Sequence, residues 1–297
     1  MSFKSGFIAI IGRPNVGKSS LLNQIFDSKI AIVSDKVQTT RNPIRGILND
    51  KDSQMIFIDT PGLHEPLDEL GRNLNRETIA QLEGIDLVYF VVSGNERFGS
   101  QDQKILERLK SSELPIFLVV NKIDKLNKAK LLTKLTELNE LHDFEEIIPI
   151  SAKENDNVDR LLEVTKQYLS DGFAYFSTED KRLVDYQQSF HYAELIREKV
   201  LHYTQDEIPH DVAVVIENIE ENDTEIYIQA LLLVQRNSQK PMVIGKQGQM
   251  IKKIRQAAQR SIKQNTQKKC TLELYVRVEK DWRAKQSKLE ALGYGEQ

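Results

Sequence analysis

The chain has 297 residues, of which 40% are hydrophobic and 29% charged, and its formal net charge is −3. This composition is globular, with room for about two domains, and excludes low-complexity and collagen-like chains. A single cysteine, Cys270, excludes an internal disulfide, and no apolar run reaches the roughly 18 residues of a membrane span, so a cytoplasmic protein is expected.

The first segment predicts a strand, a glycine loop and a helix in direct succession. GFIAII (6–11) is apolar like a buried strand, and SSLLNQIF (19–26) has helical spacing of its apolar residues. Between them, GRPNVGKS (12–19) matches the phosphate-loop pattern in full. Lys18 can reach β- and γ-phosphate oxygens, and the Ser19 hydroxyl can ligate Mg²⁺. A nucleoside triphosphate site is predicted; the alternative is a glycine turn with an accidental lysine.

Apolar runs then alternate with helical patterns. Strands are predicted at 54–58, 85–93, 115–122 and 145–151, and amphipathic helices at 101–110 and 158–169. Apolar strands separated by helices predict an α/β domain with a mostly parallel sheet. Ligands bind beyond the carboxyl ends of such strands.

Three motifs fall at those strand ends. DTPG (59–62) places Asp59 to hold the Mg²⁺ shell and the Gly62 N–H to contact the γ-phosphate, although alone it would more often be a turn. NKID (121–124) carries Asp124, whose carboxylate accepts hydrogen bonds that guanine can donate and adenine cannot. SAK (151–153) can support the base through its backbone. Together and in this order, the motifs predict GTP as the ligand.

Charge is unevenly distributed along the chain. Residues 236–288 contain 15 Lys or Arg against three acids, a net +12, so the remaining residues carry −15. A basic block on an acidic body is typical of nucleic-acid binding, although a solvated surface would have the same composition. Residues 171–190 have weak periodicity and are interpreted as a linker.

The C-terminal part predicts a second, smaller α+β domain. A helix at 192–204 precedes strands at 211–219 and 225–235, and a last strand is expected at 271–280. GKQG (245–248) lies between helical segments, giving the order αββααβ. Alone, this glycine pattern is more often only a turn, but the arrangement resembles a type-II KH domain, in which the two glycines let a sugar-phosphate backbone pass close. A solvated basic helix or a membrane-surface helix are the alternatives.

These residues carry a resemblance to the Era family, within the translation-factor-related branch of GTPases. GRPNVGKSS, QTTR (38–41), DTPGLHEP, NKID and SAK match its motifs, GKQG and its surroundings resemble a type-II KH domain, and the resemblance covers essentially the whole chain. It implies that Thr40, or else Thr39, closes on Mg²⁺ when the γ-phosphate is present. It also implies that Asn15 helps hold K⁺ at the transferring phosphate; the alternative is a loop residue chosen for its backbone angle.

The resemblance further implies a role for the chain. The RNA would be the 3′ end of small-subunit ribosomal RNA, and the work would be maturation of that ribosomal subunit, with GTP controlling RNA engagement. A monomer is expected, with peripheral contact to the inner face of the cell membrane left open.

The candidate residues divide into four groups. Catalytic candidates are Lys18, Thr40 and Gly62. Metal ligands are Ser19, Thr40 and Asp59 for Mg²⁺, with Asn15 for K⁺. RNA contacts are Gly245, Lys246, Gln247, Gly248, Lys252 and Lys253. Nucleotide contacts are Gly12, Arg13, Pro14, Asn15, Val16, Gly17, Lys18, Ser19, Ser20, Asp59, Thr60, Pro61, Gly62, Leu63, Asn121, Lys122, Asp124, Ser151, Ala152 and Lys153.

Two other functions stay open, the first supported by Leu63 and the second by the basic helix of the C-terminal part. Ras-like enzymes have a glutamine at the position of Leu63 to orient the attacking water, and leucine has no hydrogen-bonding group. The first alternative is an RNA-binding adaptor whose nucleotide site scarcely turns over. The second is a membrane-associated signalling GTPase. The domain limits expected are 1–170 for the GTPase domain and 191–297 for the KH domain with a C-terminal tail.

Overall fold

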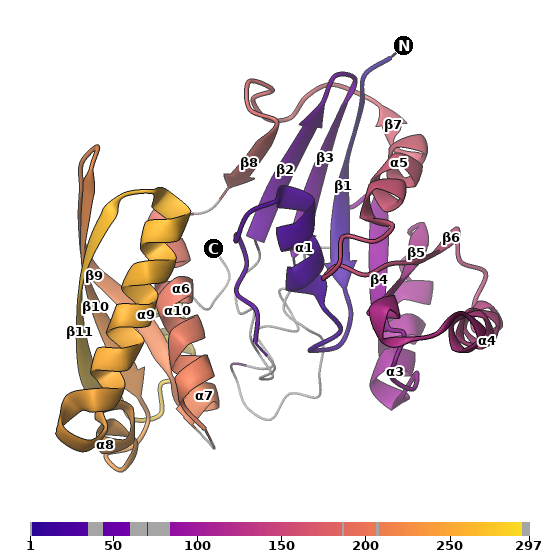
Figure 1. Cartoon of the computed structure of the whole chain (residues 1–297). Coiled ribbons are helices and arrows are strands. Elements are labelled where there is room, and N and C mark those ends of the chain that lie inside the picture. The colour runs from indigo at the N-terminus through magenta and orange to yellow at the C-terminus, as the bar shows by residue number, and fades with distance from the viewer. Residues whose placement is uncertain are drawn as a thin grey trace. The chain divides into compact units, whose positions relative to one another are not determined.

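The computed structural model describes residues 2–34, 44–59, 70, 84–185, 187–205 and 208–292 (Figure 1). These form two compact units, the first mainly from residues up to Asp185 and the second mainly from residues after it. Each unit has its own sheet and its own apolar core.

The first unit is built on a mostly parallel sheet. Its strand order is β6-β5-β4-β1-β3-β2-β8, with β7 also paired to β1. The strands from β6 to β3 in this order run parallel, and β2 is antiparallel to β3. The bounds are β1 Lys4–Ile11, β2 Ile44–Asp50, β3 Ser53–Asp59, β4 Leu87–Ser93, β5 Ile116–Asn121 and β6 Glu146–Pro149. The predicted α/β fold class and its strands at 54–58, 85–93, 115–122 and 145–151 are confirmed.

Helices cover both faces of this sheet. They are α1 Lys18–Phe26, α3 Ser100–Lys110, α4 Lys128–Asn139 and α5 Val158–Tyr168. Apolar residues of α3 and α4 share a core with alternate residues of β1, β4 and β5. On the other face, an aromatic row runs from Phe26 of α1 through Phe57, Tyr89 and Phe117 to Tyr168 of α5, with ring centroids 4.8–6.2 Å apart. This packing fixes the strand ends that carry the motifs.

Residues 171–190, suggested as a linker by the sequence, are instead largely part of the first unit. Ser170–Asp171 forms β7 on β1, and Arg182–Asp185 forms β8 on β2. The stretch between them is held by two buried amides. Asn49 donates to the carbonyls of Ser177 and Asp180, and Gln54 binds the backbone of residues 175 and 176. The unit therefore extends to Asp185 rather than to residue 170.

The second unit has the order αββααβ around a sheet of order β11-β10-β9. Its main elements are α6 Gln188–Tyr203, β9 Ala213–Glu221, β10 Glu225–Val234, α8 Gln239–Ile244, α9 Gln249–Thr266 and β11 Lys269–Val278, with short α7 Ile208–Asp211 and α10 Gln286–Ala291. β9 is antiparallel and β11 parallel to β10. Helices α6 and α9 pack together, and their apolar residues share one core with alternate residues of the strands. The predicted KH fold is confirmed.

Candidate functional site: a phosphate loop with a base-recognition edge, and a GxxG loop

Two glycines shape the phosphate loop between β1 and α1. A Cβ on Gly12 would lie 2.4 Å from the carbonyl oxygen of Val91, so the loop crosses β4 at a distance that only glycine allows. Gly17 has φ +101°, and a Cβ there would lie 2.2 Å from Asn121 Nδ2. The loop thus passes closely over the ends of two strands before α1 begins at Lys18. The N–H groups at the start of a helix favour an anion.

Lys18 is buried within the loop that it follows. Its side chain donates to the carbonyl oxygens of Gly12 at 2.9 Å and Arg13 at 3.1 Å. Burial lowers the pKa of Lys18 to about 8, against the attraction of Asp59. A buried cation is stabilised by an anion beside it, and a triphosphate would supply one.

Ser19 and Asp59 form a donor set suited to Mg²⁺. The Ser19 hydroxyl donates to Asp59 Oδ2 at 3.0 Å, and Asp59 is fully buried at the end of β3. A hydroxyl and a carboxylate are hard oxygen ligands, and Mg²⁺ at triphosphate sites is held by one or two such groups with phosphate oxygens. These two residues therefore fit the metal that the sequence predicts.

Asn121 joins the phosphate loop to the two base-recognition motifs. Its amide donates to the Val16 carbonyl at 2.9 Å, while its Oδ1 accepts from the Ala152 N–H at 3.0 Å. Lys122 donates from Nζ to the Asn15 carbonyl at 2.5 Å. The motif at the end of β5 is thus tied to the loop at the end of β1, although more than 100 residues separate them.

Asp124 is held ready as an acceptor. It lies in the short 3₁₀ turn Ile123–Lys125, and the Ser151 hydroxyl donates to its Oδ1 at 2.7 Å. Because Ser151 engages one oxygen, the other carboxylate oxygen and its remaining lone pairs are oriented for an N–H donor such as guanine offers. Lys153, also predicted in the site, is exposed and pairs with Glu154.

The other loop residues lie in different surroundings. Val16 is fully buried, whereas Asn15 is exposed with φ +66°, an angle that asparagine adopts more readily than most residues. The Arg13 side chain forms ion pairs with Glu96 and Asp102. Sequence reasoning missed both carboxylates, since only their distance from Arg13 in the folded chain identifies them.

Several predicted residues lie outside the described part of the chain. They are Thr39, Thr40, Thr60, Pro61, Gly62 and Leu63. Their roles in closing on Mg²⁺ and on the γ-phosphate remain predictions.

The GKQG loop of the second unit connects α8 to α9 with a left-handed backbone. Gly245 has φ +76° and Gly248 has φ +75°, while Gln247 between them has φ +51°. A Cβ on Gly245 would lie 2.6 Å from the Met250 Cβ, whereas a Cβ on Gly248 would meet no atom of the described residues within 4 Å. The surface beside Gly248 is therefore open to an approaching backbone.

Basic side chains follow this loop on α9. Lys252 and Lys253 are exposed, and the helix buries its opposite face through Ile254, Ala258 and Ile262. The Lys253 ammonium lies 4.3 Å from the ring centroid of Tyr203 at the end of α6. No sequence motif indicates this cation–π contact, which orients one of the predicted RNA contacts.

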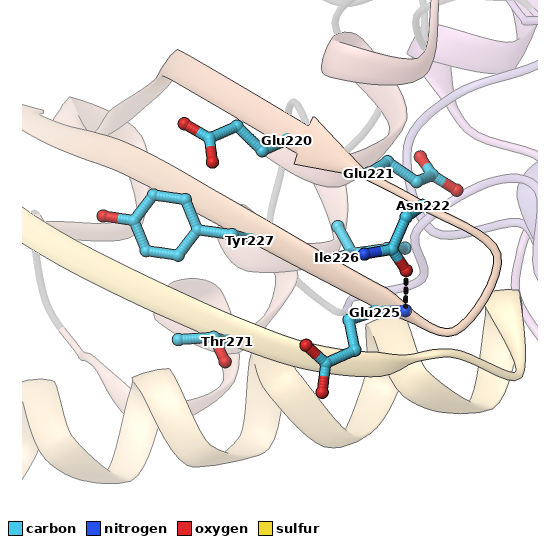
Figure 2. Close-up of a pocket in the computed structure, with 7 residues that line it drawn as sticks. All are labelled: Glu220, Glu221, Asn222, Glu225, Ile226, Tyr227 and Thr271. Atoms are coloured by element: carbon cyan, nitrogen blue, oxygen red, sulfur yellow. Dashed lines mark hydrogen bonds between the residues drawn. The ribbon is translucent and has the colours of Figure 1, made fainter.

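A shallow pocket of about 340 Å³ lies elsewhere on the second unit, around the β9–β10 turn. Figure 2 shows the Tyr227 ring between Glu220 and Thr271, as the strand pairing requires. The other lining residues are Glu221, Asn222, Glu225 and Ile226. Carboxylates repel phosphates, so this pocket does not belong to the predicted RNA surface.

Comparison with known proteins supports the fold predicted for each half of the chain. A family model described as 50S ribosome-binding GTPase matches residues 7–122, and a KH domain model matches residues 207–283. Within the described ranges, no helix is both long and apolar enough to cross a membrane.

Two solved structures match over the whole length. A variant of Era from Aquifex aeolicus bound to GDP·AlF₄⁻ is 34% identical, with a TM-score of 0.94 over 99% of this chain and 100% of that one. Era in complex with MgGDPNP and nucleotides 1506–1542 of 16S ribosomal RNA is 35% identical, with the same TM-score and coverage. With two domain models in the expected order and full-length likeness at this identity, the chain belongs to the Era family.

Proposed function

We propose that this protein binds GTP with Mg²⁺, hydrolyses it to GDP and phosphate, and binds the 3′ region of small-subunit ribosomal RNA through its KH domain during assembly of that subunit. The observation that carries the proposal is the joining of the phosphate loop to NKID and SAK by the Asn121 side chain. Family relatives hold GDP·AlF₄⁻ in one structure, and MgGDPNP with 16S ribosomal RNA in another. The protein would act in the cytoplasm.

Each residue has a limited task in this scheme. Lys18 holds β- and γ-phosphate oxygens, Ser19 and Asp59 hold the metal, and Asp124 selects guanine. The bound Mg²⁺ supplies charge neutralisation at the phosphates. Since Leu63 cannot orient water through a hydrogen bond, hydrolysis by the protein alone is expected to be slow.

Single-turnover hydrolysis with and without RNA tests the proposal. We expect GTP cleavage by the protein alone, and faster cleavage with an RNA matching the 3′ end of small-subunit ribosomal RNA than with a scrambled RNA of equal length. Absence of cleavage in both cases would support the adaptor alternative. Equal rates with the two RNAs would contradict a specific ribosomal target.

Asp124→Asn is expected to change the base preference from guanine to xanthine. The asparagine amide can donate to the additional carbonyl of xanthine, whereas the lost carboxylate leaves guanine N1–H and N2–H poorly matched. GTP affinity should fall roughly a hundredfold, and xanthosine triphosphate affinity should rise. Competition binding with both nucleotides checks this. If GTP still outcompetes xanthosine triphosphate, Asp124 does not read the base.

Asn15 is proposed to help hold K⁺ at the transferring phosphate. Turnover should then be severalfold faster in K⁺ than in Na⁺ at equal ionic strength, because K⁺ would add positive charge where the transition state is negative. Asn15→Ala should remove the difference. Asn15→Gly retains the φ +66° backbone without the amide and separates the two roles. Equal rates in both salts for the unaltered protein would leave only the backbone role.

Lys252→Ala is expected to weaken RNA binding a few-fold for all sequences alike. Loss of one phosphate contact releases about one fewer counterion, so the salt slope of log affinity should fall by about 0.7 for single-stranded RNA. RNA titrations at several salt concentrations measure both quantities. Lys269→Ala is the matched control, because Lys269 is exposed but pairs with Glu225. An unchanged slope for Lys252→Ala would remove this lysine from the RNA surface.

A further inference from the structure

A single carboxylate, that of Glu96, contacts side chains from three segments around the nucleotide site. Glu96 lies in the loop between β4 and α3. Its Oε2 accepts from Arg13 Nη2, and its Oε1 accepts from Ser93 Oγ at 3.2 Å and lies 3.4 Å from Lys122 Nζ. Arg13 belongs to the phosphate loop, Ser93 ends β4, and Lys122 belongs to the base-recognition motif.

The partners of Glu96 are themselves fixed. Arg13 Nε lies 3.2 Å from both carboxylate oxygens of Asp102, whose side chain is 2% exposed. Asp102 also accepts from the Gly99 N–H at 3.0 Å, at the start of α3. Lys122 in turn reaches the Asn15 carbonyl of the phosphate loop. The result is a closed chain of contacts from the phosphate loop through Glu96 to Lys122 and back.

The charges in this cluster are matched. Two cations, Arg13 and Lys122, face two carboxylates, Glu96 and Asp102. Burial opposes ionisation of Glu96, but its hydrogen bond and attraction to Arg13, with Lys122 nearby, hold the pKa of Glu96 below its ordinary value. Glu96 is 40% exposed and Arg13 19%, so water screens the pairs only in part.

We propose that Glu96 is a positioning residue that clamps the phosphate loop to the base-recognition motif and thereby slows nucleotide release. A nucleotide held at its phosphates by one segment and at its base by another loses contacts when the two segments move apart, and both segments are bonded to this carboxylate. Glu96 itself contacts neither phosphate nor base in this scheme. The inference rests on the proposed GTP site and deepens it by naming what controls exchange.

Glu96→Gln tests the clamp with little change in shape. The neutral amide loses the charge-assisted bond to Arg13, so GDP release should accelerate about three- to tenfold. Turnover at saturating GTP should change much less, because Lys18 at the phosphates and Ser19 at the metal remain. The rate of release of a fluorescent GDP analogue and the thermal midpoint of the nucleotide-free protein are measured together.

Two further variants separate positioning from general stability. Glu107→Gln is the matched control, because Glu107 is an exposed carboxylate of α3 that pairs with Lys110 and, among the described residues, contacts no part of the motifs. Its release rate should equal that of the unaltered protein. Arg13→Gln removes the main partner of Glu96, so the double variant should release GDP more slowly than the product of the two single effects predicts.

Failure of this inference can be told apart from failure of the proposed function. If the unaltered protein does not retain GDP, the GTP site itself is wrong. If it retains GDP and Glu96→Gln releases it at the unaltered rate, only the clamp is overturned. Two results together would also overturn the clamp. In the first, the faster GDP release of Glu96→Gln is matched by a fall in the thermal midpoint of the nucleotide-free protein. In the second, the effects of Glu96→Gln and Arg13→Gln on release simply multiply in the double variant.

Discussion

Lys18→Ala is expected to weaken GTP binding by about two orders of magnitude or more. The ammonium would form charge-assisted hydrogen bonds to two phosphate oxygens, each contributing about 1.5–3 kcal/mol. In the structure the same ammonium donates to the carbonyls of Gly12 and Arg13, from a site where burial lowers the pKa of Lys18 to about 8. Charged Lys18 is therefore poorly stabilised until a phosphate arrives. Equilibrium binding of a fluorescent GTP analogue measures the loss.

The same argument predicts that this variant folds. Removing a buried cation also removes the unfavourable free energy of its desolvation, so the thermal midpoint of nucleotide-free Lys18→Ala should not fall substantially. Lys110→Ala is the control, because Lys110 is a surface residue of α3 whose partner is Glu107. It should bind GTP as the unaltered protein does. Near-normal GTP affinity in folded Lys18→Ala would show that the glycine loop does not hold a triphosphate.

The parts of the first unit that the sequence predicts well are those whose chemistry is local. The residues of β4 and β5 are buried on both faces, so their apolar runs are continuous and easily recognised. The phosphate loop is recognised from its own eight residues, although the close contacts that require glycine at Gly12 and Gly17 come from Val91 and Asn121. The positions of the motifs along the chain then identify which predicted strand ends carry them.

The edge of the sheet could not be predicted, because long-range contacts determine it. β2, Ile44–Asp50, carries exposed and half-buried positions among its buried ones and has no continuous apolar run. β7 and β8 depend on Asn49 and Gln54, which bind backbone groups more than 120 residues away. A window of sequence around residues 171–185 contains neither amide, so the segment resembles a linker.

The residues of the candidate site divide in the same way, into those identified by local motifs and those identified by long-range contacts. Asn121, Asp124 and Ser151 were identified from their motifs, and the structure brings them together at one edge. Glu96 and Asp102 belong to no motif, and they meet Arg13 only across 83 and 89 residues of sequence. Positioning carboxylates of this kind are identified only from their contacts in the folded chain.

Gly248→Asp is expected to weaken binding of single-stranded RNA by at least about tenfold. In the KH fold a sugar-phosphate backbone passes close to this loop, and the space beside Gly248 is open, with no atom of the described residues within 4 Å of a Cβ built there. An aspartate would extend a negative charge into that space. GTP affinity should be unchanged, because GKQG belongs to the second unit and contains no nucleotide motif. RNA titrations beside nucleotide binding measure both.

Gly248→Asn separates charge from shape and backbone. Asparagine has nearly the same size as aspartate and tolerates a φ near +75° about as well, but it is neutral. If repulsion of a phosphate is the cause, Gly248→Asn should retain most of the RNA affinity that Gly248→Asp loses, and high salt should reduce the difference between them. Equal weakening by both variants would mean that the loop excludes any side chain for steric reasons. Undiminished RNA affinity in folded Gly248→Asp would mean that no phosphate approaches this loop, and the RNA surface would have to be sought on another face of the domain.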